Sequence, residues 1–183
     1  YHQTTTDLLL KPGAAQPSQQ DLYFGNLDAK VINKGVEVSM NYDIIQMEDA
    51  TWSLGFNAAY NDNMVKDFDG LIQTGEINGN GLTGAYAQLL AGGQPLFSYY
   101  LREFGGFDAN GISLYPNGDV QEFVGKSALP KVTLGINTSV SYKNWDFNAF
   151  LSGQYGFYVY NNTKNAYFTA GIIGVGKNIT KDV

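Results

Sequence analysis

Residues 31–45 read Val31-Ile-Asn-Lys-Gly-Val-Glu-Val-Ser-Met-Asn-Tyr-Asp-Ile-Ile45, and from residue 36 onward apolar and polar side chains alternate without a break. The apolar set is Val36, Val38, Met40, Tyr42 and Ile44, and the polar set is Glu37, Ser39, Asn41 and Asp43. A period of two places successive side chains on opposite faces of a β-strand. The stretch therefore predicts a strand with one apolar and one polar face.

A second alternating stretch follows the short polar segment Gln46–Ala50, and its apolar set is Trp52, Leu54, Phe56, Ala58 and Tyr60. Each apolar face runs for about ten residues, the length of a tilted strand that crosses a bilayer. Strands of soluble proteins are nearer to about five or six residues. We therefore interpret residues 31–65, called here the first hairpin, as part of a transmembrane β-barrel.

A second hairpin is predicted at residues 132–160. Apolar and small polar residues alternate through Val132–Tyr142, Lys143-Asn144 forms a tight turn, and Trp145–Tyr160 returns. Several aromatic side chains fall at strand ends or beside the short turns of both hairpins: Tyr42, Trp52, Tyr60, Tyr142 and Trp145. Rings at the two membrane interfaces of a barrel produce such a girdle, although aromatic residues also fill the core of a soluble β-sandwich.

The remaining segments have weaker patterns. We expect strands at Tyr1–Leu10, Gly25–Ile45, Pro95–Phe104, Ile112–Tyr115 and Val120–Phe123, and loops at Lys11–Gln20, Lys66–Gly93 and Asn161–Lys164. Within the loop Lys66–Gly93, which is rich in glycine and asparagine, Leu82–Leu90 could form a short helix.

The composition excludes several functions. The chain has 183 residues, a formal net charge of −6, one histidine (His2) and no cysteine. The acidic balance argues against nucleic-acid binding. A single histidine without cysteine gives no support for a metal centre or a catalytic triad, so we expect neither enzymatic activity nor a cofactor. Asp67–Gly70 and Asp108–Gly111 loosely resemble calcium loops, but simple Asp–Gly turns explain both.

Several segments, taken in chain order, resemble signatures of the SusC-like TonB-dependent transporters. Residues 26–37, Asn-Leu-Asp-Ala-Lys-Val-Ile-Asn-Lys-Gly-Val-Glu, are similar to N-x-G-x-V-x-N-K-G-V-E, in which Asn33, Gly35 and Glu37 are strand residues. Further similar segments are Thr6–Leu10, Trp52–Val65, Gly93–Tyr100, Leu129–Lys131 and Tyr142–Phe147. Leu27-Asp28 departs from the family, which often has a small residue and glycine there.

The resemblance implies an all-β, antiparallel outer-membrane barrel of 22 strands with a plugged lumen. Residues 1–183 would be a partial stretch of that one barrel domain, roughly six to eight strands, with the plug domain and the TonB box outside this chain. It further implies import of glycans or peptides through the outer membrane of a Gram-negative bacterium of the Bacteroidetes. The implied partners are a SusD-like surface lipoprotein acting as a lid, TonB, and the outer-membrane lipid with its lipopolysaccharide. A secreted carbohydrate-binding β-sandwich and a passive porin stand as alternatives.

The short turns of such barrels are periplasmic and the long loops extracellular. With both hairpin turns on the periplasmic side, an even number of strands must cross between the hairpins, and we expect two rather than none. Lys66–Gly93 is extracellular in either case. Its candidate contacts with the lid or the substrate are Tyr86, Gln88, Leu89 and Leu90.

Overall fold

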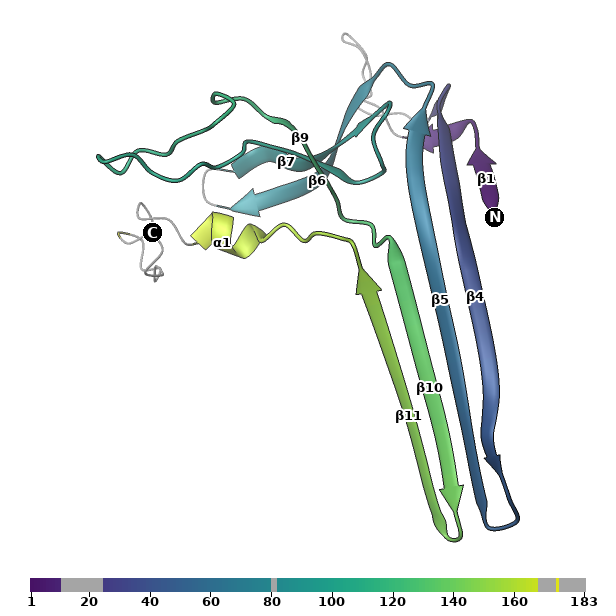
Figure 1. Cartoon of the computed structure of the whole chain (residues 1–183). Coiled ribbons are helices and arrows are strands. Elements are labelled where there is room, and N and C mark those ends of the chain that lie inside the picture. Colours follow the sequence, from purple (N-terminus) through teal and green to yellow (C-terminus); the bar gives the residue numbers. More distant parts are fainter. Residues whose placement is uncertain (11–24, 80–81, 168–173, 175–183) are drawn as a thin grey trace.

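The computed structural model describes residues 1–10, 25–79, 82–167 and 174. Figure 1 shows two parts, a tall sheet of long strands and an arm that leaves one end of it. The tall sheet, called here the wall, has the order β1-β4-β5-β10-β11 with every pair antiparallel. Its strands are β1 (His2–Thr5), β4 (Lys30–Gln46), β5 (Ala50–Lys66), β10 (Val132–Tyr142) and β11 (Trp145–Tyr155).

Both predicted hairpins are present, with short turns at the same end of the wall. Met47 donates its backbone N–H to the carbonyl oxygen of Ala50 at 2.8 Å and closes the first turn. Lys143 adopts a left-handed φ of 51°, as a two-residue hairpin turn requires. Lys143 also donates its N–H to the carbonyl of Asp49 at 2.8 Å, so the two turns are joined to each other.

The register of the four long strands sorts their side chains into two faces. One row of direct cross-strand neighbours is Met40, Phe56, Ile136 and Leu151, and the next row is Asn41, Gly55, Asn137 and Phe150. Rows therefore alternate between apolar and polar across the wall, with Phe150 as an exception on the polar face. The alternation predicted for β4, β5 and β10 is thus in register across the four long strands, so that each face of the wall is continuous.

The wall is a single layer, and its apolar face is bare. Val36 is 65% and Met40 53% exposed on that face. In a β-sandwich the apolar face would be covered by a second sheet, whereas in a membrane it faces lipid. Among the described residues no second sheet covers it, which favours the barrel over the sandwich.

Two expected strands near the amino terminus are each divided. Tyr1–Leu10 forms β1 and then β2 (Leu8–Leu10), with a left-handed Asp7 between them. Gly25–Ile45 forms β3 (Gly25–Leu27), which pairs with β2, and then β4. The break at Asp28 is a tight turn, closed by the N–H of Ala29 donating to the carbonyl of Leu27 at 2.8 Å. The predicted loop Lys11–Gln20 lies outside the described residues.

The arm, residues 67–131, is a second sheet rather than a loop. Its order is β6-β7-β8-β9, with β6 at Leu71–Gly79, β7 at Leu82–Ala91, β8 at Ser98–Leu101 and β9 at Glu122–Ser127. The predictions of a loop at Lys66–Gly93 and of a helix at Leu82–Leu90 are therefore wrong. The left-handed glycines that suggested a loop, Gly75 and Gly84, are irregularities inside a paired hairpin.

The other strands expected in the arm differ from their predicted bounds. Pro95–Phe104 contributes only β8, and Val120–Phe123 only the beginning of β9. Ile112–Tyr115 forms a single bridge, between Phe107 and Ser113.

Among the described residues no strand crosses between the hairpins, because β10 pairs directly with β5 along the whole length of β10. The expectation of two crossings is wrong, and the described wall has five strands rather than six to eight. The physical reason is that the arm satisfies its backbone hydrogen bonds in a sheet of its own, and so needs no place in the wall.

The segment after the wall also differs from expectation. β11 ends at Tyr155, before a left-handed Gly156, and the predicted loop Asn161–Lys164 begins α1 (Asn162–Tyr167). Asn161 caps this helix by accepting the N–H of Lys164 at 2.8 Å. Among the described helices none is long and apolar enough to span a membrane.

The two faces of the wall can be distinguished by spin labels, since the chain has no cysteine of its own. We expect a nitroxide on cysteine at position 40 to collide readily with oxygen, which dissolves in lipid, and poorly with a water-soluble nickel chelate. A nitroxide at position 41 should show the reverse. Equal collision rates at the two positions would contradict the assignment of the faces.

Candidate functional site at the junction of wall and arm

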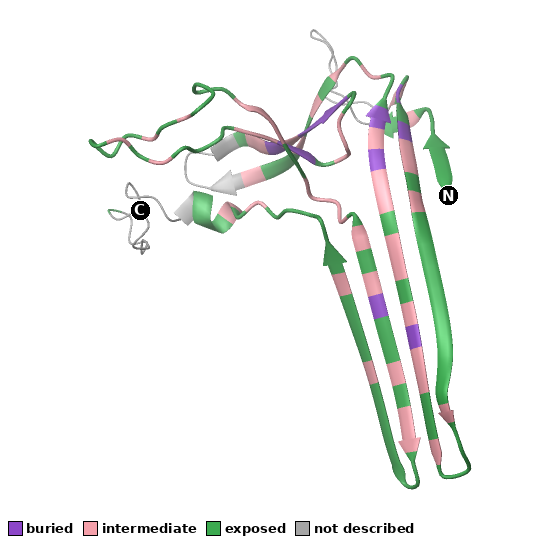
Figure 2. Ribbon diagram, viewed as in Figure 1, coloured by how far each residue is buried: buried purple, intermediate pink, exposed green. Residues whose placement is uncertain are grey.

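The buried residues gather where the arm meets the wall (Figure 2). Val31 on β4, Val65 on β5 and Leu90 on β7 form the buried cluster. Partly buried neighbours pack against it: Leu8, Phe68, Ile72 and Leu96. Val31 has the strand parity of Glu37, so the cluster lies on the polar face of the wall. The arm is therefore seated on the side that encloses the lumen of a barrel.

Backbone hydrogen bonds fix the arm to the wall at two places, between β7 and β8 and at the exit to β10. β10 begins opposite Tyr60, and beyond that point the free edge of β5 is used by the arm. The N–H of Gly93 donates to the carbonyl of Val65, and the N–H of Val65 to the carbonyl of Gln94, both at 2.9 Å. At the exit, Lys131 accepts from Asn61 at 2.8 Å and donates to Tyr155 at 2.9 Å.

A groove of about 670 Å³ lies between the arm and the segment that follows β11. It is lined by aromatic and charged side chains, among which are Tyr99, Arg102, Phe104, Phe123, Lys126 and Tyr158. Sites for small ligands commonly combine apolar and aromatic walls with a few placed polar groups. This groove combines aromatic and charged side chains in the same way.

The segment that borders the groove is held in place by Tyr99. The hydroxyl of Tyr99 donates to the carbonyl of Tyr158 at 2.9 Å and accepts the N–H of Tyr160 at 3.2 Å. The ammonium of Lys126 lies 5.0 Å from the ring centre of Tyr158. Burial raises the pKa of the Tyr160 phenol above its ordinary value. Tyr158 itself stays 50% exposed, so its ring is available to a ligand.

Polar contacts organise the loop at the outer end of the groove. Arg102 pairs with Asp119 at 3.1 Å, and the amide of Asn117 donates to Glu103 at 3.4 Å and also to Glu122. These pairs are exposed and contribute little stability, but they flank the turn that the N–H of Gly118 closes by donating to the carbonyl of Tyr115 at 3.1 Å.

The two calcium-like segments are explained by turns and ion pairs. Asp108 accepts the backbone N–H groups of Ile112 and Asn110, each at 2.8 Å. These two hydrogen bonds, with that from Ile112 first, hold the pKa of Asp108 below its ordinary value. Asp67 pairs with Lys30 at 2.6 Å. Across the described residues, no group of acidic or histidine side chains is arranged to hold a metal ion.

The structure changes the assignment of the predicted contact residues. Leu89 and Leu90 are 3% and 6% exposed, because β7 lies between β6 and β8. Their proposed contact with a lid or substrate is therefore wrong, and they are part of the arm's own packing. Tyr86 and Gln88 are half-buried on the same strand and keep some accessible surface.

The signature residues of β4 lie close to the junction. Asn33 accepts a hydrogen bond from the amide of Asn63 at 2.6 Å, and Glu37 is exposed on the polar face. A Cβ at Gly35 would collide with the carbonyl oxygen of Tyr60 and lie 2.9 Å from the ring of Tyr1. The wall therefore requires glycine there.

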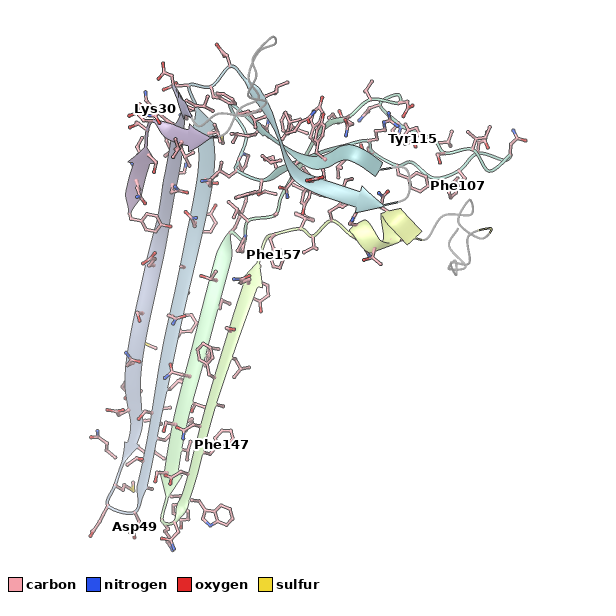
Figure 3. All side chains as sticks on the ribbon, turned by 180° about the vertical axis from the view of Figure 1, so that it is seen from behind. Lys30, Asp49, Phe107, Tyr115, Phe147 and Phe157 are labelled. Carbon is pink, nitrogen blue, oxygen red and sulfur yellow. The ribbon has the colours of Figure 1, made fainter. Side chains whose placement is uncertain are left out.

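Sequence reasoning missed the groove residues, because the groove forms only when the segment after β11 returns to the arm. The available signal was the cluster Phe157–Tyr160, which was assigned to a wall strand. Figure 3 shows Phe157 near the arm, while Phe147 lies well down the wall towards the turn that holds Asp49.

Comparison with known proteins supports the fold. No family model matches the chain. Two TonB-dependent receptors of Formosa agariphila are 29% and 36% identical over 89% and 68% of the chain. The TonB-dependent receptor SusC of Bacteroides thetaiotaomicron is 26% identical over 87% of the chain. The chain spans between 12% and 19% of the length of these three relatives.

Comparison with solved structures also finds similar folds among peptide transporters. The RagAB peptide importer in its closed-closed state covers 92% of the chain, with a TM-score of 0.69 and 20% identity. The RagAB peptide transporter covers 85% of the chain, with a TM-score of 0.65 and 20% identity. The chain corresponds to 20% and 18% of those chains.

The wall, its two faces and these neighbours define a partial stretch of a transmembrane β-barrel, as the alternation predicted. The chain is SusC-like TonB-dependent transporter sequence, as the segments around Asn33 and Trp52 indicated. Its relatives are receptors and transporters rather than enzymes.

Proposed function

We propose that this chain forms part of the barrel wall, and with its arm part of the extracellular entrance, of an importer. The importer would carry a glycan or a peptide through the outer membrane of a Gram-negative bacterium. The observation that carries the proposal is that the arm, with its groove, packs on the polar face of the wall. An arm on that face adjoins the lumen, whereas an arm on the apolar face would adjoin lipid.

The direction of the wall supports an extracellular arm. Both hairpin turns are short and lie at one end, and the arm leaves the other end (Figure 1). In bacterial outer-membrane barrels short turns are periplasmic and long connections extracellular. The arm would then meet arriving substrate, which it would hold together with a SusD-like surface lipoprotein acting as a lid.

The rest of the proposal follows from the resemblance. Residues 1–183 would belong to one barrel domain of 22 strands, and a plug domain and a TonB box elsewhere in such a transporter would couple release of the substrate to TonB. The half-buried Tyr86 and Gln88 remain candidates for contact with the lid. Dependence of uptake on TonB would separate this importer from a passive porin.

Removal of the Tyr158 ring should weaken substrate capture. In the complete gene product we expect Tyr158→Ala to raise the substrate concentration for half-maximal uptake about fivefold or more, since a hot-spot aromatic is worth above about 1 kcal/mol. Radiolabelled glycan and peptide pools, offered to cells that lack their own copy, would measure this effect. Tyr142→Ala is the matched control, because Tyr142 is 53% exposed but lies beside the short turn at the far end of the wall. Equal uptake by both variants would refute the groove as the substrate surface.

A further inference from the structure

We infer that Asn63, paired with Asn33, is the positioning residue that sets the arm over the lumen. Asn63 is 7% exposed at the junction. Its amide nitrogen donates to Asn33 Oδ1 at 2.6 Å, and its Oδ1 accepts the backbone N–H of Leu96 at 2.8 Å. One side chain thus joins β4 and β5 of the wall to the segment that leads into β8 of the arm.

The orientation of the two amides follows from chemistry. A backbone N–H can only donate, so the atom of Asn63 that faces Leu96 must be its oxygen. The amide nitrogen of Asn63 then faces Asn33, which must present an oxygen. Asn63 is therefore both an acceptor and a donor, whereas Asn33 needs only to accept.

The hydrogen bonds continue from Leu96 to the groove. The hydroxyl of Ser127 on β9 donates to the carbonyl of Leu96 at 2.8 Å. The carbonyl of Ser127 accepts the N–H of Tyr158 at 3.0 Å. A connected path therefore runs from Asn33 on the wall to Tyr158, which lines the groove. Since buried polar groups that lose a partner are costly, the path favours one position of the arm.

This role explains why the junction contains amides rather than leucines. An apolar residue at position 63 would leave the N–H of Leu96 without an acceptor in a site that water reaches poorly. The charged side chains nearest along these strands do not enter the pair, because Lys34 and Asp62 bind each other at 3.4 Å on the opposite face. The effect of this positioning role on uptake rests on the function proposed above. The position of the arm can be measured whether or not the protein is an importer.

The test uses aspartate, which has the shape of asparagine without its donor. Asn33→Asp keeps the oxygen that accepts from Asn63. Asn63→Asp keeps the acceptor for Leu96, and Asn33 can turn its nitrogen towards the new carboxylate. The double variant has two acceptors and no donor. At neutral pH the two carboxylates repel each other, so the side chain at position 63 should turn away from the N–H of Leu96 and release the arm. At acid pH one carboxyl group takes a proton and again supplies a donor.

The measurement is the distance distribution between spin labels at Ser39 on the wall and Asn110 on the arm, by double electron–electron resonance in the complete, membrane-embedded protein. We expect the unaltered protein and both single variants to give one narrow distribution. The double variant should give a broad or shifted distribution at pH 7.5 that narrows as the pH falls. The charge-matched control, Asn41→Asp with Asn57→Asp, alters exposed positions of the same face below the junction and should change nothing.

Two results would overturn the inference: displacement of the arm by Asn33→Asp alone, or an unchanged distribution in the double variant at neutral pH. If the double variant does not assemble, Ser127→Ala replaces it, since this change breaks the path within the arm and leaves the wall untouched. It should broaden the same distribution, and a narrow one would refute the path. A displaced arm with unchanged uptake would leave the positioning role intact and refute the proposed function.

Discussion

Replacement of Ile136 by arginine is expected to destabilise the membrane-embedded protein by about 2–4 kcal/mol. Ile136 is near the middle of β10, and its row of neighbours is the apolar one that contains Met40, Phe56 and Leu151. A guanidinium there would have to stay in hydrocarbon or distort the bilayer to reach water. Urea titration in vesicles, read by the gel mobility of the folded barrel, would measure the loss.

The matched control is Asn137→Arg, one residue further along the same strand. Asn137 is exposed on the polar face, where its amide lies over Gly55, and an arginine in its place can extend into water. We expect its stability to stay within about 0.5 kcal/mol of the unaltered protein, as for ordinary surface substitutions. Equal losses for the two variants would mean that the faces of the wall have been exchanged or mixed.

Replacement of Gly35 by valine is expected to have the second largest effect. The Cβ would enter the space of the Tyr60 carbonyl oxygen, which is backbone and cannot turn away. The ring of Tyr1 lies over the same glycine, 2.9 Å from the position of that Cβ. Overpacking of this kind costs about 1–3 kcal/mol, and more where backbone must move.

The expected result for Gly35→Val is earlier urea unfolding, together with protease cleavage near the junction, because the pairing of β4 with β5 is forced apart there. Ser39→Val serves as the control. It adds a β-branched residue to the same strand and face, at an exposed position four residue pairs lower. A Gly35→Val protein that unfolds together with the control would show that the strands can shift to admit a side chain.

The wall could be predicted from the sequence because its two faces meet different surroundings. In Val132–Tyr142 every second residue is an apolar or small side chain on the face assigned to lipid. The predicted bounds of this strand are those of β10 in the structure. The arm offered no such signal. Leu89 and Leu90 are adjacent in sequence and both buried, since β7 is covered more evenly, and so the period of two is lost. Gly84 lies inside β7, and in the sequence this glycine favoured the prediction of a loop.

The candidate site was predictable only in part. The signature segment identified Asn33 and Gly35, but their roles depend on Asn63 and Tyr60, which lie on the other strand of the hairpin. The contact of Asn63 with Leu96 depends in turn on the arm returning to the wall. Leu89 and Leu90 were mistaken for binding residues, because apolar side chains in an apparent loop resemble an exposed patch until their strand is seen to be central.

The arm enters and leaves the wall at neighbouring strands, β5 and β10, which pair directly over the whole length of β10. Because the entropy of closing a connection grows slowly, each doubling of its length costs only about 0.6 kcal/mol. An arm of another length could therefore replace this one without a change in the register between β5 and β10.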